Sequence, residues 1–481
     1  MSKNIQYLAW GDINWTSVQK RVHRVQIRIY KAKQSDEISK MHWLQDLLVH
    51  STDAKLLAIH KVTTTHKVAG VYDGKSLTNT QKLALAKKLR IDCKAHPIKK
   101  VWIAKPSKTK RQKLEISIIK DQAKQILAKL ALEPEWNAIF EPHSYAYRKK
   151  VPDALESIFL SLHNKNPKWV FSADIRKSFD KTQYPILLAK LNTFPLIEKQ
   201  IESWLKAGIL EGYANTEKHY LMMETKTPYG GILSELLVNI ALHGLETHLN
   251  NFVKRLKKKS REAKMLNKKD LTFVRFSDDF ILMHDNREIL QLCICEANKW
   301  LGEIGLRIIM EKSSTILGTS GFYFLGFQII QVVKYNKYKA KITPSKNSQK
   351  LLLLKIREII QKNKAISSYQ LINKLRPIII RWGNYFKFCE CTTIYNNLSH
   401  RIFLKLRAWV FRRDTRSARG IIKEKYFPNN KTWKFGNKIY KDNWVLYGKT
   451  RNNKNQVIEN FLPHLSWIDR EKFIKVNKSK L

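Results

Sequence analysis

The chain has 481 residues, and its 89 Lys and Arg residues against 40 Asp and Glu leave a formal net charge of +49. A folded protein with this charge needs a polyanion as its partner, either nucleic acid or an anionic membrane surface. A wholly disordered chain is excluded, because 43% of the residues are apolar and 11% aromatic, enough for a sizeable core. No apolar run reaches the length of a bilayer span, so we expect nucleic acid and no membrane partner.

The charge is unevenly distributed along the chain. From Lys341 to Leu481, 32 basic and 8 acidic residues leave +24 on 141 residues. The first 340 residues carry +25, from 57 basic and 32 acidic residues. The C-terminal part has over twice the net charge per residue of the N-terminal part. This predicts a moderately basic N-terminal part with its own chemistry and a C-terminal part whose main role is electrostatic.

Apolar residues at helical spacing predict three helices in the first hundred residues: 18–30, 43–57 and 83–89. Two strands then form a basic hairpin, 100–105 and 113–119, followed by a helix over 119–132. Three later β-like runs, 169–175, 273–283 and 322–333, are separated by helical stretches at 184–205 and 233–257. Three further helices are expected over 351–362, 369–389 and 398–413. Strands separated by helices favour an α+β layer architecture.

Three carboxylates stand inside the apolar β-like runs, where an unpaired charge is costly to bury. They are Asp174 in the first run and the adjacent pair Asp278 and Asp279 in the second. Neighbouring carboxylates repel unless a cation lies between them. Two divalent ions held by such a trio can activate a 3′-hydroxyl and stabilise a leaving pyrophosphate, and hard oxygen ligands suit Mg²⁺. For an isolated Asp-Asp pair the alternative is a simple tight turn.

The pair is accompanied by other motifs in a fixed order: Thr227-Pro-Tyr-Gly-Gly-Ile-Leu-Ser234, Phe276-Ser-Asp-Asp279, Gly305-Leu-Arg-Ile-Ile-Met-Glu-Lys312 and Phe324-Leu-Gly-Phe327. In this order they resemble the sequence blocks of reverse transcriptases encoded within group II introns, and the resemblance covers nearly the whole chain. It implies an RNA-directed DNA polymerase with Asp174, Asp278 and Asp279 as catalytic residues. These aspartates would hold two Mg²⁺ ions, with Mn²⁺ as a substitute.

The resemblance also implies which residues bind the incoming nucleotide. Lys105 and Arg111, on the basic hairpin, match the cations that grip the triphosphate. Phe179 matches the aromatic gate that sits against the sugar and excludes a 2′-hydroxyl. The remaining nucleotide-binding residues that it implies are Tyr229, Gly230 and Lys312.

The runs Arg381-Trp-Gly-Asn-Tyr-Phe and Leu406-Arg-Ala-Trp-Val-Phe-Arg-Arg413 resemble the maturase domain of the same family, which helps the encoding intron RNA fold for splicing. Cations that neutralise phosphates, interleaved with aromatics that stack, suit a structured RNA. The residues that we predict to bind RNA are Arg381, Trp382, Tyr385, Arg407, Arg412 and Arg413. The alternative, that the aromatics only form the core of the domain, stays open for Trp382 and Trp409.

Three departures from the family pattern matter. Tyr229 stands where the family usually has Gln, which puts polymerase rate or fidelity in question. The catalytic turn reads Phe-Ser-Asp-Asp rather than Tyr-Ala-Asp-Asp, a change we expect activity to survive. No cysteine follows Trp433, so we expect no endonuclease of the His-Asn-His type with its paired Cys-x-x-Cys motifs.

We therefore predict an α+β right-hand polymerase in four parts. They are an N-terminal, mostly helical extension that contacts RNA and template (1–98), fingers and palm (99–340), an α-helical thumb and maturase domain (341–420), and a short basic C-terminal tail (421–481). The predicted partners are intron RNA, an RNA template, a DNA primer or target and dNTPs, and a homodimer is left open. We expect activity in splicing and intron mobility.

The alternative function is a splicing cofactor whose polymerase domain serves only as an RNA-binding scaffold. The N-terminus shows neither a signal peptide nor a transit peptide, so we expect the protein to act in the compartment that makes it. The abundance of Lys, Asn and Ile suggests an AT-rich genome. The predicted location is a plastid (chloroplast) for an organelle-encoded protein, and otherwise the bacterial cytoplasm or a mitochondrion.

Overall fold

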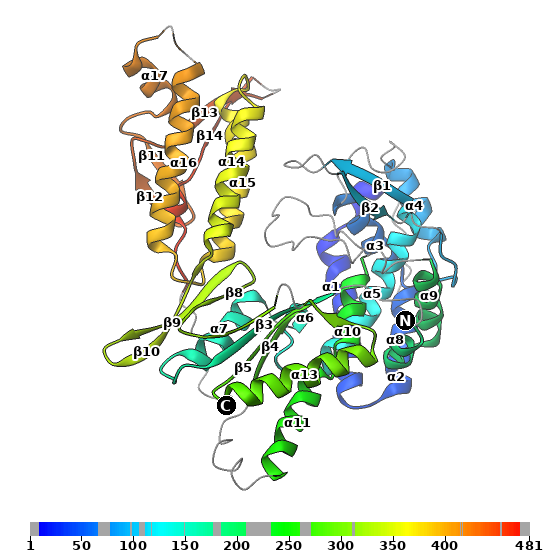
Figure 1. Cartoon of the computed structure of the whole chain (residues 1–481). Helices are drawn as coiled ribbons and strands as arrows, with labels where there is room; N and C mark the ends of the chain where they lie inside the picture. The colour runs from blue at the N-terminus through cyan, green and yellow to red at the C-terminus, as the bar shows by residue number, and fades with distance from the viewer. Residues whose placement is uncertain are drawn as a thin grey trace. The chain divides into compact units, whose positions relative to one another are not determined.

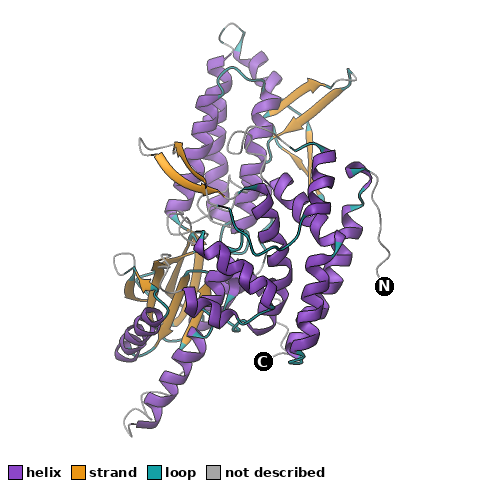
Figure 2. Cartoon of the chain, turned by 90° about the vertical axis from the view of Figure 1, so that its right-hand side faces the viewer, coloured by secondary structure: helices purple, strands orange, loops and turns teal. Residues whose placement is uncertain are grey.

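The computed structural model describes residues 9–65, 77–96, 99–104, 111–116, 118–148, 150–176, 184–207, 232–259, 271–309, 313–413, 415, 417–452 and 455–471. These residues form two compact units. The first unit holds the described residues up to 154 and within 168–315, and the second holds 155–167 and 316–471. Helices predominate, and the strands gather in separate small sheets (Figure 2), which confirms the α+β class.

The long helix α5 (Ile119–Ile139) lies at the centre of the first unit and is buried along most of its length. Three helices pack against it (Figure 1): α1 (Trp15–Gln34), α2 (Ile38–His50) and α3 (Thr52–Thr65). The single helix predicted over 43–57 is thus two helices. Ser51 separates them, because its hydroxyl accepts a hydrogen bond from the Ala54 N–H at 3.1 Å and starts a new helix.

Two more of the predicted helices are interrupted. Pro195 begins a new helix within 184–205, as expected of a residue that lacks an N–H and favours the first helical turn. Gly244, with a φ of +98°, breaks the stretch 233–257. The remaining helices that belong wholly or partly to this unit are η1 (Trp10–Asp12), α4 (Asn79–Lys88), α6 (Tyr145–Arg148), α7 (Val151–Leu162), α8 (Tyr184–Leu191), α9 (Pro195–Lys206), α10 (Ser234–Ala241), α11 (Leu245–Lys259) and α13 (Arg287–Glu303).

The predicted basic hairpin is confirmed as an antiparallel pair, β1 (Lys99–Ala104) and β2 (Arg111–Ile116). A separate five-stranded sheet has the order β4-β5-β3-β6, with β7 also pairing with β3. Its strands are β3 (Trp169–Arg176), β4 (Thr272–Phe276), β5 (Asp279–His284), β6 (Arg307–Ile308) and β7 (Ser314–Leu317). Helix α13 packs against β3, β5 and β6, so this helix supports the sheet that carries the three aspartates.

Besides residues 155–167, the second unit contains the antiparallel sheet β10-β9-β8, made of β8 (Phe322–Phe324), β9 (Phe327–Lys334) and β10 (Lys337–Pro344). Three long helices follow, as predicted: α14 (Lys346–Lys362), α15 (Ser368–Phe386) and α16 (Thr392–Arg413). Helix α15 starts with a capping box between Ser367 and Gln370. None of the helices among the described residues is long and apolar enough to cross a membrane.

The C-terminal segment, predicted only as a basic tail, is folded. It contains α17 (Arg419–Tyr426), β11 (Thr432–Phe435), β12 (Lys438–Lys441), β13 (Tyr447–Arg451), β14 (Val457–Phe461) and η5 (Leu465–Trp467). Strands β13 and β14 pack against α15, and η5 packs against α16. Gly448 permits this contact, because a Cβ there would overlap the backbone nitrogen of Tyr369. The guanidinium of Arg376 donates to the carbonyl of Phe461 at 3.3 Å.

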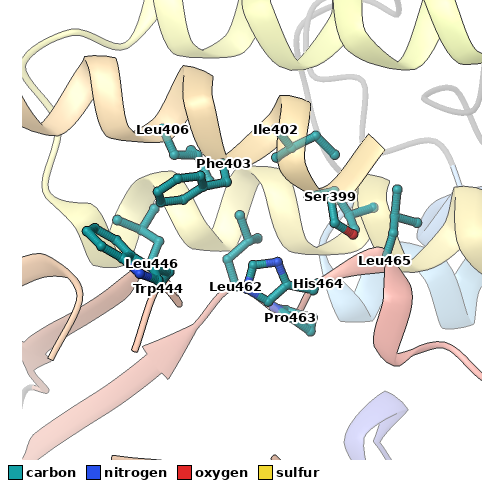
Figure 3. A pocket seen from close by; sticks show the side chains of 11 residues that line it. Ser399, Ile402, Phe403, Leu406, Trp444, Leu446, Leu462, Pro463, His464 and Leu465 are labelled. Carbon is teal, nitrogen blue, oxygen red and sulfur yellow. The ribbon is translucent and has the colours of Figure 1, made fainter. Parts of the chain in front are cut away.

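A small apolar pocket marks where this segment meets the long helices (Figure 3). It is lined by Ile379, Ser399, Ile402, Phe403, Leu406, Trp444, Leu446, Leu462, Pro463, His464 and Leu465. Burial lowers the pKa of His464, although Asp442, 3.5 Å from its Nε2, opposes the shift. The apolar lining shows that the connections flanking β13 and β14, together with η5, complete the core of the second unit.

Candidate active site

The three aspartates come from neighbouring strands of the five-stranded sheet. Asp174 lies near the end of β3, while Asp278 and Asp279 lie where the β4–β5 hairpin turns. Strands β3 and β5 are antiparallel, with Asp174 directly opposite Asp279, a register that places both side chains on one face. The N–H of Ile175 donates to the carbonyl of Asp278 at 3.2 Å. Pairing between strands therefore brings together residues that are about a hundred positions apart.

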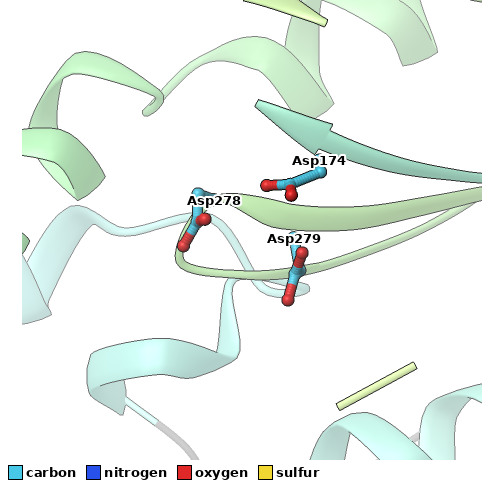
Figure 4. A group of neighbouring side chains, drawn as sticks. All are labelled: Asp174, Asp278 and Asp279. Atoms are coloured by element: carbon cyan, nitrogen blue, oxygen red, sulfur yellow. The ribbon is translucent and has the colours of Figure 1, made fainter. Parts of the chain in front are cut away.

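The carboxylates form one cluster (Figure 4). Each residue offers an oxygen within 4.8 Å of the others, and each is only 7% exposed. Three negative charges at this spacing repel strongly in a partly buried site. Closely spaced carboxylate oxygens are the ligands that hard divalent cations such as Mg²⁺ prefer. The donor set thus fits a divalent metal site.

The turn that carries Asp278 is backbone-strained. Ser277 has a φ of +58°, in the left-handed region that a non-glycine residue adopts at some cost. The guanidinium of Arg275 donates from Nη1 to the carbonyl of Ser277 at 3.3 Å and to Oδ1 of Asn239, on α10, at 2.9 Å. Arg275 therefore ties the turn to a neighbouring helix.

Arg275 is fully buried, at 0% exposure. Burial lowers its pKa to about 10, against the opposing effect of Glu141 and Glu246. Glu141 accepts from the Thr247 backbone N–H at 2.8 Å, and Glu246 is 2.6 Å from Nδ1 of His143. We did not single out Arg275 from the sequence. The signal was present, because a lone arginine interrupts the apolar run Phe273-Val-Arg-Phe.

The predicted nucleotide-binding residues lie largely outside the described part of the chain. This holds for Lys105, Phe179, Tyr229, Gly230 and Lys312. Arg111 begins strand β2, and its side chain is likewise outside the description. Their roles stay predictions.

Comparison with known families decides which kind of protein carries this site. Residues 103–329 match the model of the reverse transcriptase (RNA-dependent DNA polymerase) domain, and residues 10–89 match the N-terminal domain of reverse transcriptase. Residues 349–427 match the maturase-specific domain of group II introns. The chain belongs to the group II intron-encoded reverse transcriptases. It is an RNA-directed DNA polymerase with a maturase function in splicing.

Individual relatives agree with the family. This reverse transcriptase is 27% identical to "Maturase-like protein 1" of Euglena gracilis over 420 residues, which are 82% of this chain and 80% of the relative. The protein of the same name from Euglena longa is 24% identical over 411 residues, 83% of this chain and 82% of the relative. "Group II intron-encoded protein LtrA" of Lactococcus lactis is 31% identical over 168 residues, 34% of this chain and 26% of the relative.

Of the two aromatic residues predicted to stack on RNA, Trp382 is packed inside the maturase part of the reverse transcriptase and Tyr385 is half-buried. Trp382 is 3% exposed, and its ring centroid lies 4.5 Å from that of Phe386. It follows Ile379 at helical spacing on the buried side of α15. Tyr385 is half-buried, and its hydroxyl donates to the carbonyl of Leu325 at 3.0 Å. Burial assigns Trp382 to the core alternative, while the predicted RNA contact of the half-buried Tyr385 stays a prediction.

The predicted arginines divide into two kinds. Arg381, Arg407 and Arg412 are exposed, the last two on α16. Arg413 is also exposed, but its Nη2 donates to the carbonyl of Ala365 at 3.0 Å, so it holds the loop between α14 and α15. Arg407 and Arg412 are thus better probes of RNA binding than Arg413. Trp409, which the sequence left open, is 6% exposed and belongs to the core.

Proposed function

We propose that this reverse transcriptase copies RNA into DNA at the Asp174, Asp278 and Asp279 cluster, using two Mg²⁺ ions. The observation that carries the proposal is the convergence of three buried carboxylates within 4.8 Å in a chain of net charge +49. Divalent ions held there would favour ionisation of a primer 3′-hydroxyl and stabilise negative charge on the leaving pyrophosphate. A right-hand arrangement of fingers, palm and thumb is part of the same proposal, supported by the matched reverse transcriptase domain.

The protein residues contribute position and exclusion of water. Asp174 and Asp279 face each other across the β3–β5 ladder, so the sheet fixes the distance between two of the metal ligands. Asp278 is held by the turn, and the turn by Arg275. Because all three are nearly buried, their charges are weakly screened and bind a cation more strongly than exposed carboxylates would. For Lys105 and Arg111 we propose contacts to the triphosphate, and for Phe179 discrimination against ribonucleotides.

Removal of metal tests the proposal directly. In primer extension on a poly(A) template, DNA synthesis by the wild type should stop on addition of EDTA and resume with excess Mg²⁺ or Mn²⁺, because the bound cations activate the 3′-hydroxyl and stabilise the leaving pyrophosphate. The measurement is the rate of nucleotide incorporation before and after each addition. Synthesis that continues undiminished in EDTA would contradict the metal site.

We further propose that the exposed face of α16 binds the intron RNA. Arg401, Arg407 and Arg412 are exposed along this helix. Within the described part of the chain, none of the three forms an ion pair, so their charges are available to phosphates.

For the compartment we propose a plastid. Relatives in Euglena, a bacterium and yeast fit an organelle or bacterial gene.

Charge reversal on α16 tests the RNA surface. Replacing Arg407 and Arg412 together by Glu should weaken intron RNA binding and reduce the slope of log affinity against log salt by about 1.5 to 2, as expected for two lost phosphate contacts. The measurement is a filter-binding titration at several salt concentrations. Lys434→Glu with Lys441→Glu, on the exposed hairpin β11–β12, is the control with equal charge change. Equal losses in both double variants would count against α16.

A further inference from the structure

The hairpin formed by β9 and β10 has a free end that neither matched domain covers (Figure 1). The matches to the reverse transcriptase and maturase domains end at 329 and begin at 349, so residues 330–348, which include most of the hairpin, lie between them. Tyr335 and Asn336 connect the strands with φ values of +51° and +53°. Two successive positive φ values give a tight two-residue turn whose twist matches the strands. The end of the hairpin is therefore a defined structure.

One face of this hairpin carries four lysines. Lys334 is directly opposite Lys337, Lys339 is opposite Val332, and Lys341 is opposite Ile330. Opposed residues, and residues two apart on a strand, project to the same face. We call Lys334, Lys337, Lys339 and Lys341 the lysine face. The row from Lys337 to Lys341 extends about 14 Å along the strand.

The opposite face is packed. Phe327, Ile329 and Gln331 on β9 are buried, as are Ala340 and Ile342 on β10. The side chain of Gln331 donates to the carbonyl of Leu162 at 2.9 Å. Packing on this side leaves the lysine face as the one turned to solvent. Lys334, Lys337 and Lys341 are exposed and Lys339 is partly exposed.

Among the described residues, no carboxylate compensates the charge on the lysine face. Residues 313–357 contain eight basic residues and no Asp or Glu. Within the described part of the chain, none of the four lysines has a carboxylate at ion-pairing distance. Like charges placed directly opposite each other, as in Lys334 and Lys337, destabilise a strand pair. Such destabilising repulsion between lysines is expected at a binding site, where a ligand supplies the compensating negative charge.

An exposed aromatic ring lies at the end of the same hairpin. Tyr335 is 81% exposed. Its ring centroid lies 5.3 Å from Nζ of Lys334 and 5.7 Å from Nζ of Lys339. Lysines that follow a strand, next to an exposed ring, match a partner that has regularly spaced anionic groups and flat bases. An acidic protein would complement the lysines but would leave the ring without a specific partner.

We propose that the lysine face binds the phosphate backbone of a single-stranded nucleic acid and that Tyr335 stacks on one of its bases. The proposal rests on the proposed role of this chain as an RNA-binding polymerase and adds a contact outside both the aspartate cluster and α16. The ligand is a template RNA or a DNA strand, which share this chemistry. This contact does not involve the metal ions. Removing metal should therefore stop DNA synthesis while leaving nucleic-acid binding by the lysine face unchanged.

The test measures binding of labelled oligo(U) and oligo(dT) to the full chain, without dNTPs, by fluorescence anisotropy at several salt concentrations. Lys337→Glu with Lys341→Glu leaves the two lysines beside Tyr335 in place. This variant should bind more weakly, with the salt slope reduced by about 1.4, as expected for two phosphates of a single strand. Lys434→Glu with Lys441→Glu, on another exposed hairpin of the same unit, is the matched control. The oligonucleotide that shows the larger loss identifies the strand.

Tyr335 is tested separately, because stacking and charge respond differently to salt. Tyr335→Ala should weaken binding roughly 5- to 150-fold, with the salt slope unchanged, and Tyr335→Phe should restore most of the affinity because it keeps the ring. Thermal unfolding of each variant confirms that the fold persists. Hairpin variants that bind like the control double variant, or a poly-glutamate peptide that binds the wild type as tightly as oligo(U), would overturn the proposal. If the hairpin variants bind oligonucleotide more weakly while the Arg407 and Arg412 double variant binds intron RNA like the wild type, the hairpin contact holds without the α16 contact.

Discussion

Asp278→Asn should abolish DNA synthesis while leaving the fold at least as stable as in the wild type. Asparagine keeps the size of the side chain but removes one of three carboxylates that lie within 4.8 Å. Metal ions stabilise the transition state of phosphoryl transfer by several kcal/mol, so we expect the rate to fall by about 10³-fold or more. In metal-free buffer the variant should unfold at an equal or higher temperature, because repulsion within the cluster is reduced.

The measurements are primer extension on an RNA template and thermal unfolding in EDTA. Glu303→Gln is the matched control, since Glu303 is an exposed carboxylate at the end of α13 in the same unit. It should change neither quantity. Synthesis by Asp278→Asn at the wild-type rate would remove this residue from the catalytic set. An inactive wild type would favour the alternative of a polymerase domain that serves only as an RNA-binding scaffold.

Arg275→Met should destabilise the protein by about 3–5 kcal/mol, the usual effect of removing one partner from a buried charge network. The arginine has 0% exposure, and its positive charge faces the buried carboxylates Glu141 and Glu246. Without it these carboxylates lose one of the positive groups that face them, and the carbonyl of Ser277 loses a donor. The free energy of unfolding in urea measures the first effect.

Arg275→Lys separates positioning from stability. Lysine keeps the charge, but its shorter side chain does not carry the ammonium to the position of Nη1, the one nitrogen that donates to both Asn239 and Ser277. We expect a smaller loss of stability than in Arg275→Met, together with slower primer extension at a temperature where the variant is folded. Arg255→Met, at an exposed position on α11, is the control. An Arg275→Lys variant that polymerises at the wild-type rate would show that the hydrogen bonds of the Arg275 Nη1 do not position the turn.

Many of the secondary-structure elements could be predicted from periodicity. The hairpin of β1 and β2, the strand carrying Asp174 and the three helices α14 to α16 occur where the residue pattern indicated them. Breaks within helices were missed, because single residues such as Ser51 and Gly244 decide them through one hydrogen bond or one dihedral angle. The C-terminal strands were missed for another reason. They are short, and they are stabilised by packing against α15 and η5 rather than by their own pattern.

The maturase helices show the limit for individual side chains. Composition could not distinguish a tryptophan that stacks on RNA from one that fills a core, and Trp382 and Trp409 are both buried. The arginines were more predictable, because long charged side chains are rarely buried. Arg413 nevertheless binds backbone carbonyls of a loop 47 and 48 residues earlier in the chain, a partner that helical spacing does not reveal.

The sequence by itself determined the partner class and the kind of chemistry. A charge of +49 required a polyanion, and carboxylates inside apolar strands indicated a cation site, because burying an uncompensated charge is unfavourable wherever the strand lies. Only the tertiary structure decided that Asp174 stands opposite Asp279, that Arg275 is the buried support of the turn, and that four lysines share one face of a hairpin. These are facts of strand register and packing, which join residues far apart in the chain and so depend on the whole fold.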